Sequence, residues 1–465
     1  MTEQHNPGAD KGCPVRMWRS GRPCGRPLLA ARYSGDEDHV CLMHSSDPNK
    51  DQAVFQEEFK RTLSQAGTGI ADFTGFVFPA RSCGVREFEP WCVFLMVTFS
   101  KSADFTGATF KNGAGFVGAT FRQSADFTGA TFEQEAGFIS TTFTQTARFE
   151  ETAFKKTVDL SLASFLGSAE FLKTRFRRDS RGWDAEPGPI FTGTRFKKPE
   201  EVKFYKTYLG QALFHNCDVS KFEFSDVSWR ARGGKSRQMV LDETVELKLF
   251  APELEPREGS ADERNYELVQ NIYRRLKKNY ENVPDYATAG HFHYGEIEMR
   301  RLSSRHRNRV LRWLHRRLGL VAWYRYASEY GESYMRPAIW MAVVLAVFSL
   351  LYPLAGLHQQ AGRYQSAPVV RTASAPQGIE SAELTYWNPS TPELGPPKVK
   401  WVTGRPRVRL VGNSLMTTLY VAAFQRDLVY EPSYPWGRLV ALVETLLTST
   451  LIALFLLAVR RAFRR

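Results

Sequence analysis

Large aromatic residues recur along the middle of the chain at a period that fits neither a helix nor a strand. Between residues 105 and 154 the steps from one phenylalanine to the next alternate between five and six, and a small residue, mostly alanine, stands two positions before each. Because helices repeat every 3.6 residues and strands every 2, we interpret each step as one side of a four-sided coil that stacks on its neighbours through backbone hydrogen bonds. The expected repeat core is Phe105, Phe110, Phe116, Phe121, Phe127, Phe132, Phe138, Phe143, Phe149 and Phe154.

These units resemble the pentapeptide-repeat family in its Phe-rich form. The resemblance rests on Ala103–Gly107 and Ala125–Gly129, both Ala-Asp-Phe-Thr-Gly, and extends over residues 69–229. It implies a right-handed quadrilateral β-helix. The rhythm breaks at Arg81–Glu87 and Arg177–Pro189, and we expect both stretches to loop out of the solenoid.

The charge balance of the repeats argues against DNA mimicry. Some pentapeptide-repeat proteins resemble DNA in charge and shape, which requires a strongly acidic rod. The whole chain has a formal net charge of +13, and residues 100–229 hold 17 basic and 16 acidic residues. The rod is therefore nearly neutral and has no stripe of one sign for a nucleic acid. We expect its sides to bind a protein partner that the sequence does not identify.

Four potential metal ligands stand in residues 1–60. Cys-x-x-His spacing lets two side chains reach one ion from a tight turn, and each of the two cysteines before it adjoins a turn-forming residue. We interpret the segment as a small module held by structural Zn²⁺. The alternatives are replacement of one ligand by His39, or a disordered leader with free thiols. The predicted ligands are Cys13, Cys24, Cys41 and His44.

Helical periodicity follows a linker at residues 230–260. Apolar positions three and four apart predict a helical hairpin, similar to the helix-turn-helix units of tetratricopeptide proteins, and a basic amphipathic helix completes the segment 261–333. Because apolar stretches come next, we interpret the arginines of this helix as contacts to anionic lipid headgroups. Nucleic-acid binding through residues 300–317 is the alternative. The arginines are Arg305, Arg309, Arg312, Arg316 and Arg317.

Two apolar stretches in the last third predict transmembrane helices at residues 335–357 and 437–460. Each has about 20 apolar residues, enough to cross a bilayer, and arginine clusters flank the pair. By the positive-inside rule both termini are cytoplasmic, and residues 358–413 form an extracytoplasmic loop. We therefore expect a multi-pass protein of a bacterial inner membrane.

This region resembles the pore module of two-span ion channels, with residues 414–424 in the place of the re-entrant pore helix. The expected filter stretch, Gln425–Glu431, contains no glycine, so potassium selectivity is not expected. The candidate pore or membrane-interior residues are Glu444, Thr417 and Thr418. Carboxylates inside a membrane face a partner or water, and a buried hydrogen bond is the alternative for Glu444.

These patterns predict a multidomain, non-enzymatic scaffold that displays a β-helix in the cytoplasm and is anchored by two transmembrane α-helices. No nucleophile motif, phosphate loop or acid–base pair is recognisable in the sequence. The alternatives are an oligomeric ion conductor regulated by the β-helix, and a nucleic-acid-binding protein. Homo-oligomerisation is left open.

Overall fold

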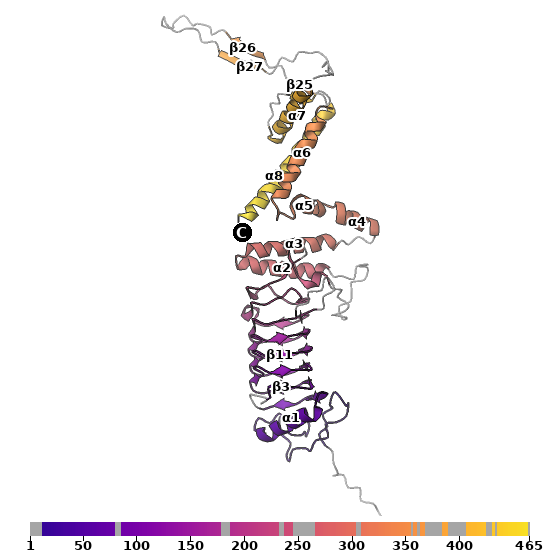
Figure 1. Ribbon diagram of the computed structural model, residues 1–465, viewed down its shortest axis with the longest axis vertical. Helices are drawn as coiled ribbons and strands as arrows, with labels where there is room; N and C mark the ends of the chain where they lie inside the picture. The colour runs from indigo at the N-terminus through magenta and orange to yellow at the C-terminus, as the bar shows by residue number, and fades with distance from the viewer. Residues whose placement is uncertain are drawn as a thin grey trace, which may run out of the picture. The chain divides into compact units, whose positions relative to one another are not determined.

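The computed structural model divides the chain into two compact units, residues 1–317 and 318–465, of which the first holds the repeats and the second the apolar helices (Figure 1). The predicted loops at 81–87 and 177–189, the linker 230–260 and the filter stretch 425–431 lie partly outside the described residues. The described residues are 12–79, 85–177, 187–231, 237–244, 266–303, 308–354, 357–359, 363–367, 384–388, 406–424, 430–432 and 435–463.

Four parallel β-sheets build the repeat segment. Successive strands enter the sheets in the same order in each coil, and residues 22 apart pair, as Ala103, Ala125 and Ala147 do. Alternating steps of five and six residues complete a coil after four sides, which accounts for this interval. The predicted β-solenoid, of about six coils, is confirmed. The right-handed, quadrilateral shape of this β-helix stays a prediction.

Most strands of these sheets are two residues long, because each side of a coil turns a corner after five or six residues. The first sheet contains β1 (Ile70–Asp72), β4 (Trp91–Val93), β8 (Ala114–Gly115), β12 (Ala136–Gly137), β16 (Val158–Asp159) and β19 (Pro189–Ile190). The second contains β2 (Val77–Phe78), β5 (Thr98–Phe99), β9 (Thr120–Phe121), β13 (Thr142–Phe143), β17 (Ser164–Phe165) and β20 (Arg195–Phe196). The third contains β6 (Ala103–Asp104), β10 (Ala125–Asp126), β14 (Ala147–Arg148), β18 (Ala169–Leu172), β21 (Val202–Tyr205) and β22 (Glu223–Ser225). The fourth contains β3 (Glu87–Phe88), β7 (Thr109–Phe110), β11 (Thr131–Phe132) and β15 (Ala153–Phe154).

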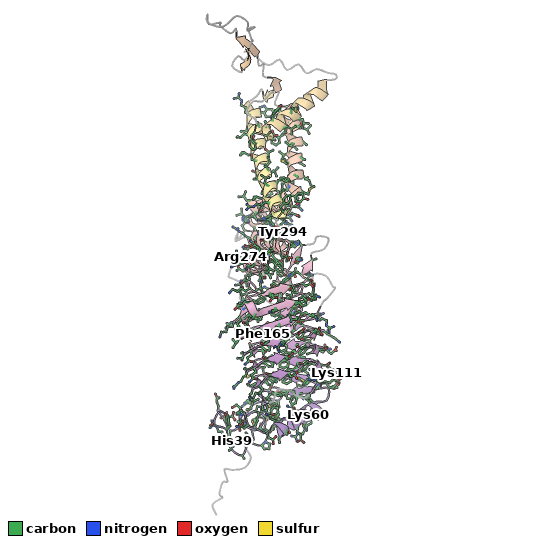
Figure 2. The ribbon with its side chains drawn as sticks, turned by 90° about the vertical axis from the view of Figure 1, so that its left-hand side faces the viewer. His39, Lys60, Lys111, Phe165, Arg274 and Tyr294 are labelled. Carbon is green, nitrogen blue, oxygen red and sulfur yellow. The ribbon has the colours of Figure 1, made fainter. Side chains whose placement is uncertain are left out.

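Stacked phenylalanine rings fill the interior of the solenoid. The Phe127 ring lies parallel to those of Phe105 and Phe149 in the neighbouring coils, with centroids 5.1 and 5.2 Å apart. It also meets the ring of Phe138 edge-on. Figure 2 labels Phe165, a buried member of the same core, and Lys111, which is exposed on the outside. Parallel and edge-on contacts between aromatic rings add to the stability gained by burying them.

Threonine replaces alanine at some inward positions without leaving a polar group unpaired. The hydroxyls of Thr141 and Thr152 donate to the carbonyl oxygens of Phe116 and Phe127, at 2.6 and 2.7 Å. Because each acceptor belongs to the preceding coil, the buried hydroxyl links two coils. The small inward position therefore accepts alanine or threonine.

The N-terminal end of the solenoid is covered by α1 (Gln52–Ala66). Its two buried residues, Phe55 and Phe59, both pack edge-on against Phe78 of the first coil, at ring-centroid distances of 5.1 and 5.2 Å. Phe59 also contacts Phe73, at 4.8 Å. Solenoids need such caps because a terminal coil has no further coil on which to bury its core.

The C-terminal end is closed by the helical hairpin of α2 (Tyr266–Asn282) and α3 (Tyr286–Leu302). The Tyr280 ring stacks on Phe224 of the last coil with its plane tilted by 2°, and the indole N–H of Trp229 donates to the Tyr280 hydroxyl at 2.9 Å. The hairpin that the sequence predicts is therefore the second cap of the solenoid.

Asn279 donates hydrogen bonds to the backbone carbonyl groups at the end of the last coil. Its side-chain amide is buried and donates to the carbonyl oxygens of Val219 and Phe222, at 2.9 and 2.7 Å. These carbonyls have no following coil to bond to, so the amide satisfies groups that would otherwise be costly to bury.

Shorter elements complete the first unit. Leu241 forms a small buried apolar cluster with Ile190 and Leu213. The remaining elements are η1 (Pro199–Glu201), β23 (Arg230–Ala231), β24 (Gln238–Met239), η2 (Leu241–Glu243) and α4 (Arg309–Leu318), the last of which ends at the unit boundary.

The second unit is a group of packed helices with two short antiparallel strand pairs, β25 (Leu357–Gln359) with β28 (Tyr430–Pro432) and β26 (Arg363–Ala367) with β27 (Leu384–Asn388). Arg461, near the end of α8, donates to the Tyr330 carbonyl, which precedes α6, at 2.8 Å. β25 follows α6 and pairs with β28, which precedes α8, so α6 and α8 run antiparallel. The elements are α5 (Leu320–Ser328), α6 (Met335–Leu351), β25 (Leu357–Gln359), β26 (Arg363–Ala367), β27 (Leu384–Asn388), α7 (Pro406–Ala422), β28 (Tyr430–Pro432) and α8 (Pro435–Ala462).

The apolar helices differ in length from the sequence prediction. Within the described residues one helix, Trp436–Ala462, is long and apolar enough to cross a membrane, and α6 is a shorter apolar helix of 17 residues. At 1.5 Å per residue α6 spans about 25 Å. It ends just before Pro353, which has no backbone N–H to continue the helical hydrogen bonds. Conversely, α7 begins at Pro406, inside the predicted loop 358–413, since proline suits the first turn of a helix.

Candidate metal centre

Two of the predicted ligands face each other across a short antiparallel ladder. The Cys24 N–H donates to the Val15 carbonyl at 2.7 Å, and the Cys13 N–H donates to the Arg26 carbonyl at 2.9 Å. Gly25 has a φ of 69°, a left-handed conformation that glycine adopts without strain, and its N–H returns to the Cys13 carbonyl. These backbone hydrogen bonds hold the segments that carry Cys13 and Cys24 next to each other.

The other two ligands come from a single turn. The N–H groups of His44 and Ser45 both donate to the Cys41 carbonyl, at 3.1 and 3.0 Å, which folds the Cys-x-x-His segment back on itself. The ammonium group of Lys50 donates to the carbonyls of Leu42 and Ser45, at 2.9 and 2.8 Å, and supports the turn. Burial lowers the pKa of Lys50 to about 7.

The ligand atoms of all four residues converge. One ligand atom each from Cys13, Cys24, Cys41 and His44 lies within 4.8 Å of the other three. The His44 Nδ1 atom is 3.3 Å from the Cys13 sulfur and 3.2 Å from the Cys41 sulfur. Zn²⁺–ligand distances of about 2.1–2.3 Å give tetrahedral edges of about 3.6–3.8 Å, so the four residues could bind a metal ion after small adjustments.

The histidine is oriented for metal binding by its second nitrogen. The Nε2 atom of His44 is 3.0 Å from the Thr74 carbonyl oxygen, which requires a proton on Nε2 and leaves the Nδ1 lone pair directed at the cysteines. The alternative ligand, His39, is bonded elsewhere, through its Nε2 to the Leu29 carbonyl at 2.7 Å. The described geometry therefore favours His44.

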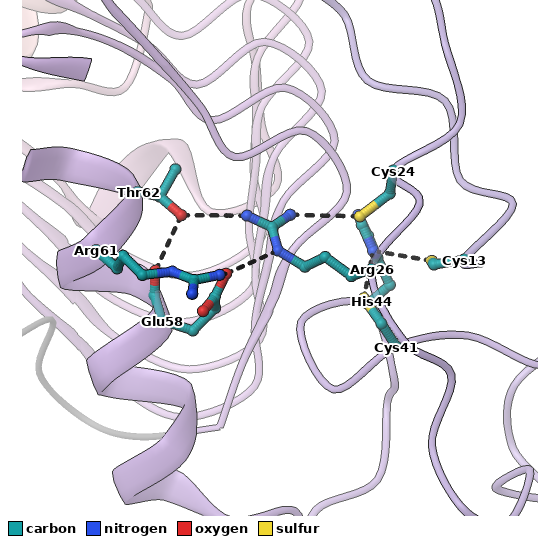
Figure 3. Close-up of polar contacts among 8 residues, drawn as sticks. All are labelled: Cys13, Cys24, Arg26, Cys41, His44, Glu58, Arg61 and Thr62. Carbon is teal, nitrogen blue, oxygen red and sulfur yellow. Dashed lines mark hydrogen bonds and ion pairs between the residues drawn. The ribbon is translucent and has the colours of Figure 1, made fainter. Parts of the chain in front are cut away.

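Arg26 connects the cluster to α1 (Figure 3). Its guanidinium donates to the Cys24 sulfur at 3.3 Å, to the Glu58 carboxylate at 3.0 Å and to the Thr62 hydroxyl at 3.2 Å. Hydrogen bonds from Cys13 and then Cys41 hold the pKa of the Cys24 thiol below its ordinary value. The guanidinium also offsets the excess negative charge that three thiolates would leave around a divalent ion.

The cluster is joined to the first coil of the solenoid as well. The Val77 N–H of β2 donates to the Met43 carbonyl at 2.8 Å, continuing the pattern of bonds between coils. The His44 ring meets the Phe76 ring edge-on at 5.3 Å. The segment that carries the four ligands therefore contacts the first coil and contributes to the N-terminal cap, together with α1. The sequence carries no signal that identifies Arg26 or Thr74 as its supporting residues.

The predicted membrane-interior residues lie inside the second unit. Glu444 is fully buried on α8, and its Oε2 atom accepts a hydrogen bond from the Tyr352 hydroxyl at 2.5 Å. Thr417 and Thr418 are buried on α7. Glu444 therefore forms a buried hydrogen bond within the protomer, as the alternative interpretation predicts.

The predicted lipid-contacting arginines have different positions. Arg305 and the side chain of Arg309 lie outside the described residues, whereas Arg317 is exposed and Arg312 half-exposed on α4. Arg316 donates to the Leu302 carbonyl at 2.6 Å, so it holds α4 to α3. The ten predicted core phenylalanines, Phe105 to Phe154, are all buried.

Comparison with known proteins supports the assignment of the repeats. Residues 94–141 and 116–163 match the family model of pentapeptide repeats (9 copies), in the same coils that form the four sheets. No curated protein and no solved structure matches the chain. The central coils of the solenoid, residues 94–163, are thus built of pentapeptide repeats.

Proposed function

We propose that the protein is a non-enzymatic scaffold that displays its solenoid on the cytoplasmic side of a bacterial inner membrane and binds a protein partner along the solenoid. One observation carries this proposal: both ends of the solenoid are covered by the chain's own elements, α1 and the α2–α3 hairpin, and its interior is filled by aromatic rings. The sides are therefore the surface that remains for a partner. Pentapeptide-repeat solenoids typically serve as interaction proteins, which agrees with this role.

The charges on the sides favour a partner recognised by shape and hydrogen bonds. On the third sheet Arg148 lies between Asp126 and Glu170 of the adjacent coils, at 3.7 and 3.4 Å. On the fourth, Lys155 pairs with Glu133 at 2.6 Å. Because opposite charges neutralise one another between coils, the sides offer little net field to a charged ligand.

The exposed faces of the second unit support membrane anchoring. Leu442 and Leu446 of α8, one turn apart, are 58% and 61% exposed, and large apolar side chains of α6 are exposed as well. Apolar surface of this extent indicates contact with lipid or with another protein. In the proposed arrangement α6 and α8 cross the membrane as an antiparallel pair, with Arg460 and Arg461 on the cytoplasmic side.

The donor set of the metal centre favours zinc. Three thiolates and one imidazole are soft and borderline ligands in a number that fills a tetrahedral shell, which is the structural zinc pattern. All four protein ligands are used, so no position is open for substrate. The ion would hold the N-terminal cap together and is not expected to do chemistry.

Membrane anchoring is tested by extraction of the full-length chain. We expect it to remain in the membrane pellet at high salt and alkaline pH and to be released by detergent. Replacing Leu442 and Leu446 together with arginine should move it to the supernatant or cause its degradation, because each charge costs about 2.5–3.5 kcal/mol inside a bilayer. The same positions changed to alanine are the matched control and should stay in the pellet. Wild-type protein in the supernatant without detergent would refute the anchoring.

Partner binding is tested by purifying the chain from detergent-solubilised membranes and identifying co-purifying proteins. One arginine is placed on each side of a coil, at the half-exposed positions Gly137 of the first sheet, Thr142 of the second, Thr131 of the fourth, or Thr128 in the turn after β10 of the third. We expect a partner in near-stoichiometric amount that is lost with one of these four variants and retained by the others, which serve as controls. Recovery of the chain alone, or retention of the partner by all four, contradicts binding along a side.

A further inference from the structure

Glu444 has an oxygen atom for which the described residues provide no donor. Its Oε2 atom is bonded to Tyr352, whereas Oε1 is buried without a hydrogen-bond partner. No lysine, arginine or histidine forms an ion pair with Glu444 in the part of the chain that the structure describes. A buried polar atom of this kind indicates a water, an ion or a proton that completes its surroundings.

Three buried hydroxyl groups of α7 and α8 have already used their hydrogens. Ser414 donates to the Ser349 carbonyl, Thr418 to the Ser414 carbonyl at 3.0 Å, and Thr448 to the Glu444 carbonyl at 2.8 Å. All of these hydroxyl groups are buried. Their oxygen atoms retain lone pairs and can still accept a hydrogen bond or bind a cation.

These residues belong to one packed region. Val421, one turn after Thr418 on α7, clusters with Phe348 and Tyr352, and Val440 of α8, one turn before Glu444, packs against the same cluster. Residues of all three helices thus meet in the cluster that contains Tyr352, whose hydroxyl is bonded to the carboxyl group. The surroundings are apolar apart from the hydroxyls, and an isolated carboxylate in such surroundings is strongly destabilised unless a positive charge neutralises it.

We propose that Glu444 and the neighbouring hydroxyl oxygens form a binding site for a small monovalent cation, Na⁺, which competes with a proton for the free carboxyl oxygen. Carboxylate and hydroxyl oxygens are the ligands that hard cations prefer, and a single carboxylate matches a single positive charge. A water molecule would satisfy hydrogen bonding but would leave the charge uncompensated. The site lies within one protomer and does not depend on the partner of the solenoid.

The test uses the unmodified full-length protein in detergent and dicyclohexylcarbodiimide, a reagent that labels protonated carboxyl groups in apolar surroundings. Labelling is followed by mass spectrometry of peptides at constant, mildly acidic pH. With a dissociation constant of about 10 mM, about 100 mM Na⁺ should slow labelling of Glu444 about tenfold compared with choline at the same ionic strength. Raising the pH should slow it as well, because fewer carboxyl groups carry the proton.

Three measurements make the result specific. Glu444→Gln should lose the label, and Glu332, which is paired with Arg461, reports reaction at an acid outside the cluster. Thr418→Val, which keeps the shape and removes a hydroxyl, should weaken the Na⁺ protection, measured as the ratio of the labelling rates in choline and in Na⁺. Labelling that depends on pH but not on Na⁺ would show a proton site alone and overturn the proposal. Absence of label at Glu444 in choline would overturn it too.

Discussion

Replacing Cys24 with serine, or removing the metal with a strong chelator, is expected to open the N-terminal cap of the solenoid. The metal content should fall from about one ion per chain to near zero. Because a structural zinc site contributes on the order of 10 kcal/mol to the fold it holds, the turn that carries His44 should lose its contacts to Thr74 and Phe76. Hydrogen exchange of the backbone at residues 73–78 should then accelerate by about 100-fold or more.

The matched control for this prediction is Cys92→Ala. Cys92 is buried in the first sheet and is not part of the cluster, so the variant should keep its metal and change exchange only around β4. The variant Arg26→Lys distinguishes the contribution of the ion from that of the arginine contacts. It should retain the metal but loosen α1, because the bonds to Glu58 and Thr62 are lost. If Cys24→Ser loses the metal and residues 73–78 remain protected, the cluster does not hold the cap.

The repeats could be predicted because their periodicity is enforced by the core itself. Most of the large inward positions are filled by rings that stack on rings 22 residues away, so Phe105, Phe127 and Phe149 recur in register in the sequence. The metal ligands were recognisable for a related reason, since only a few residue types bind such ions and two of them stand at a turn spacing. In both cases the chemistry restricts the residue identity at a fixed spacing.

The supporting contacts could not be predicted, because their partners are distant in the chain and chemically unrestricted. Arg26 is one of many arginines, and nothing in the sequence relates it to Glu58. Asn279 resembles any polar residue on a helix, although it satisfies the last coil of the solenoid. The capping role of the helical hairpin could not be predicted for the same reason: its amphipathic pattern shows that a face is buried, not what covers it.

The second large effect is expected from Phe127→Ala in the middle of the solenoid, which should lower the free energy of unfolding by about 3–5 kcal/mol. The ring is fully buried and is stacked on both sides, by Phe105 and Phe149. Its loss leaves a cavity that the neighbouring coils cannot close, because their positions are fixed by the backbone bonds of four sheets. Hydrogen exchange across residues 103–150, or urea unfolding of the full chain in detergent, measures the loss.

Two matched variants show whether stacking between coils determines this loss. Phe127→Leu retains most of the apolar volume without the ring and should cost less, about 1–2 kcal/mol. Within the part of the chain that the structure describes, Phe176 is the last ring of its row and stacks in parallel only on Phe154, with the centroids 5.7 Å apart. Phe176→Ala should therefore lose less stability than Phe127→Ala, and the loss should remain near the C-terminal coils. Equal losses at the two positions would mean that burial alone, independent of the stack, sets the stability of the coils.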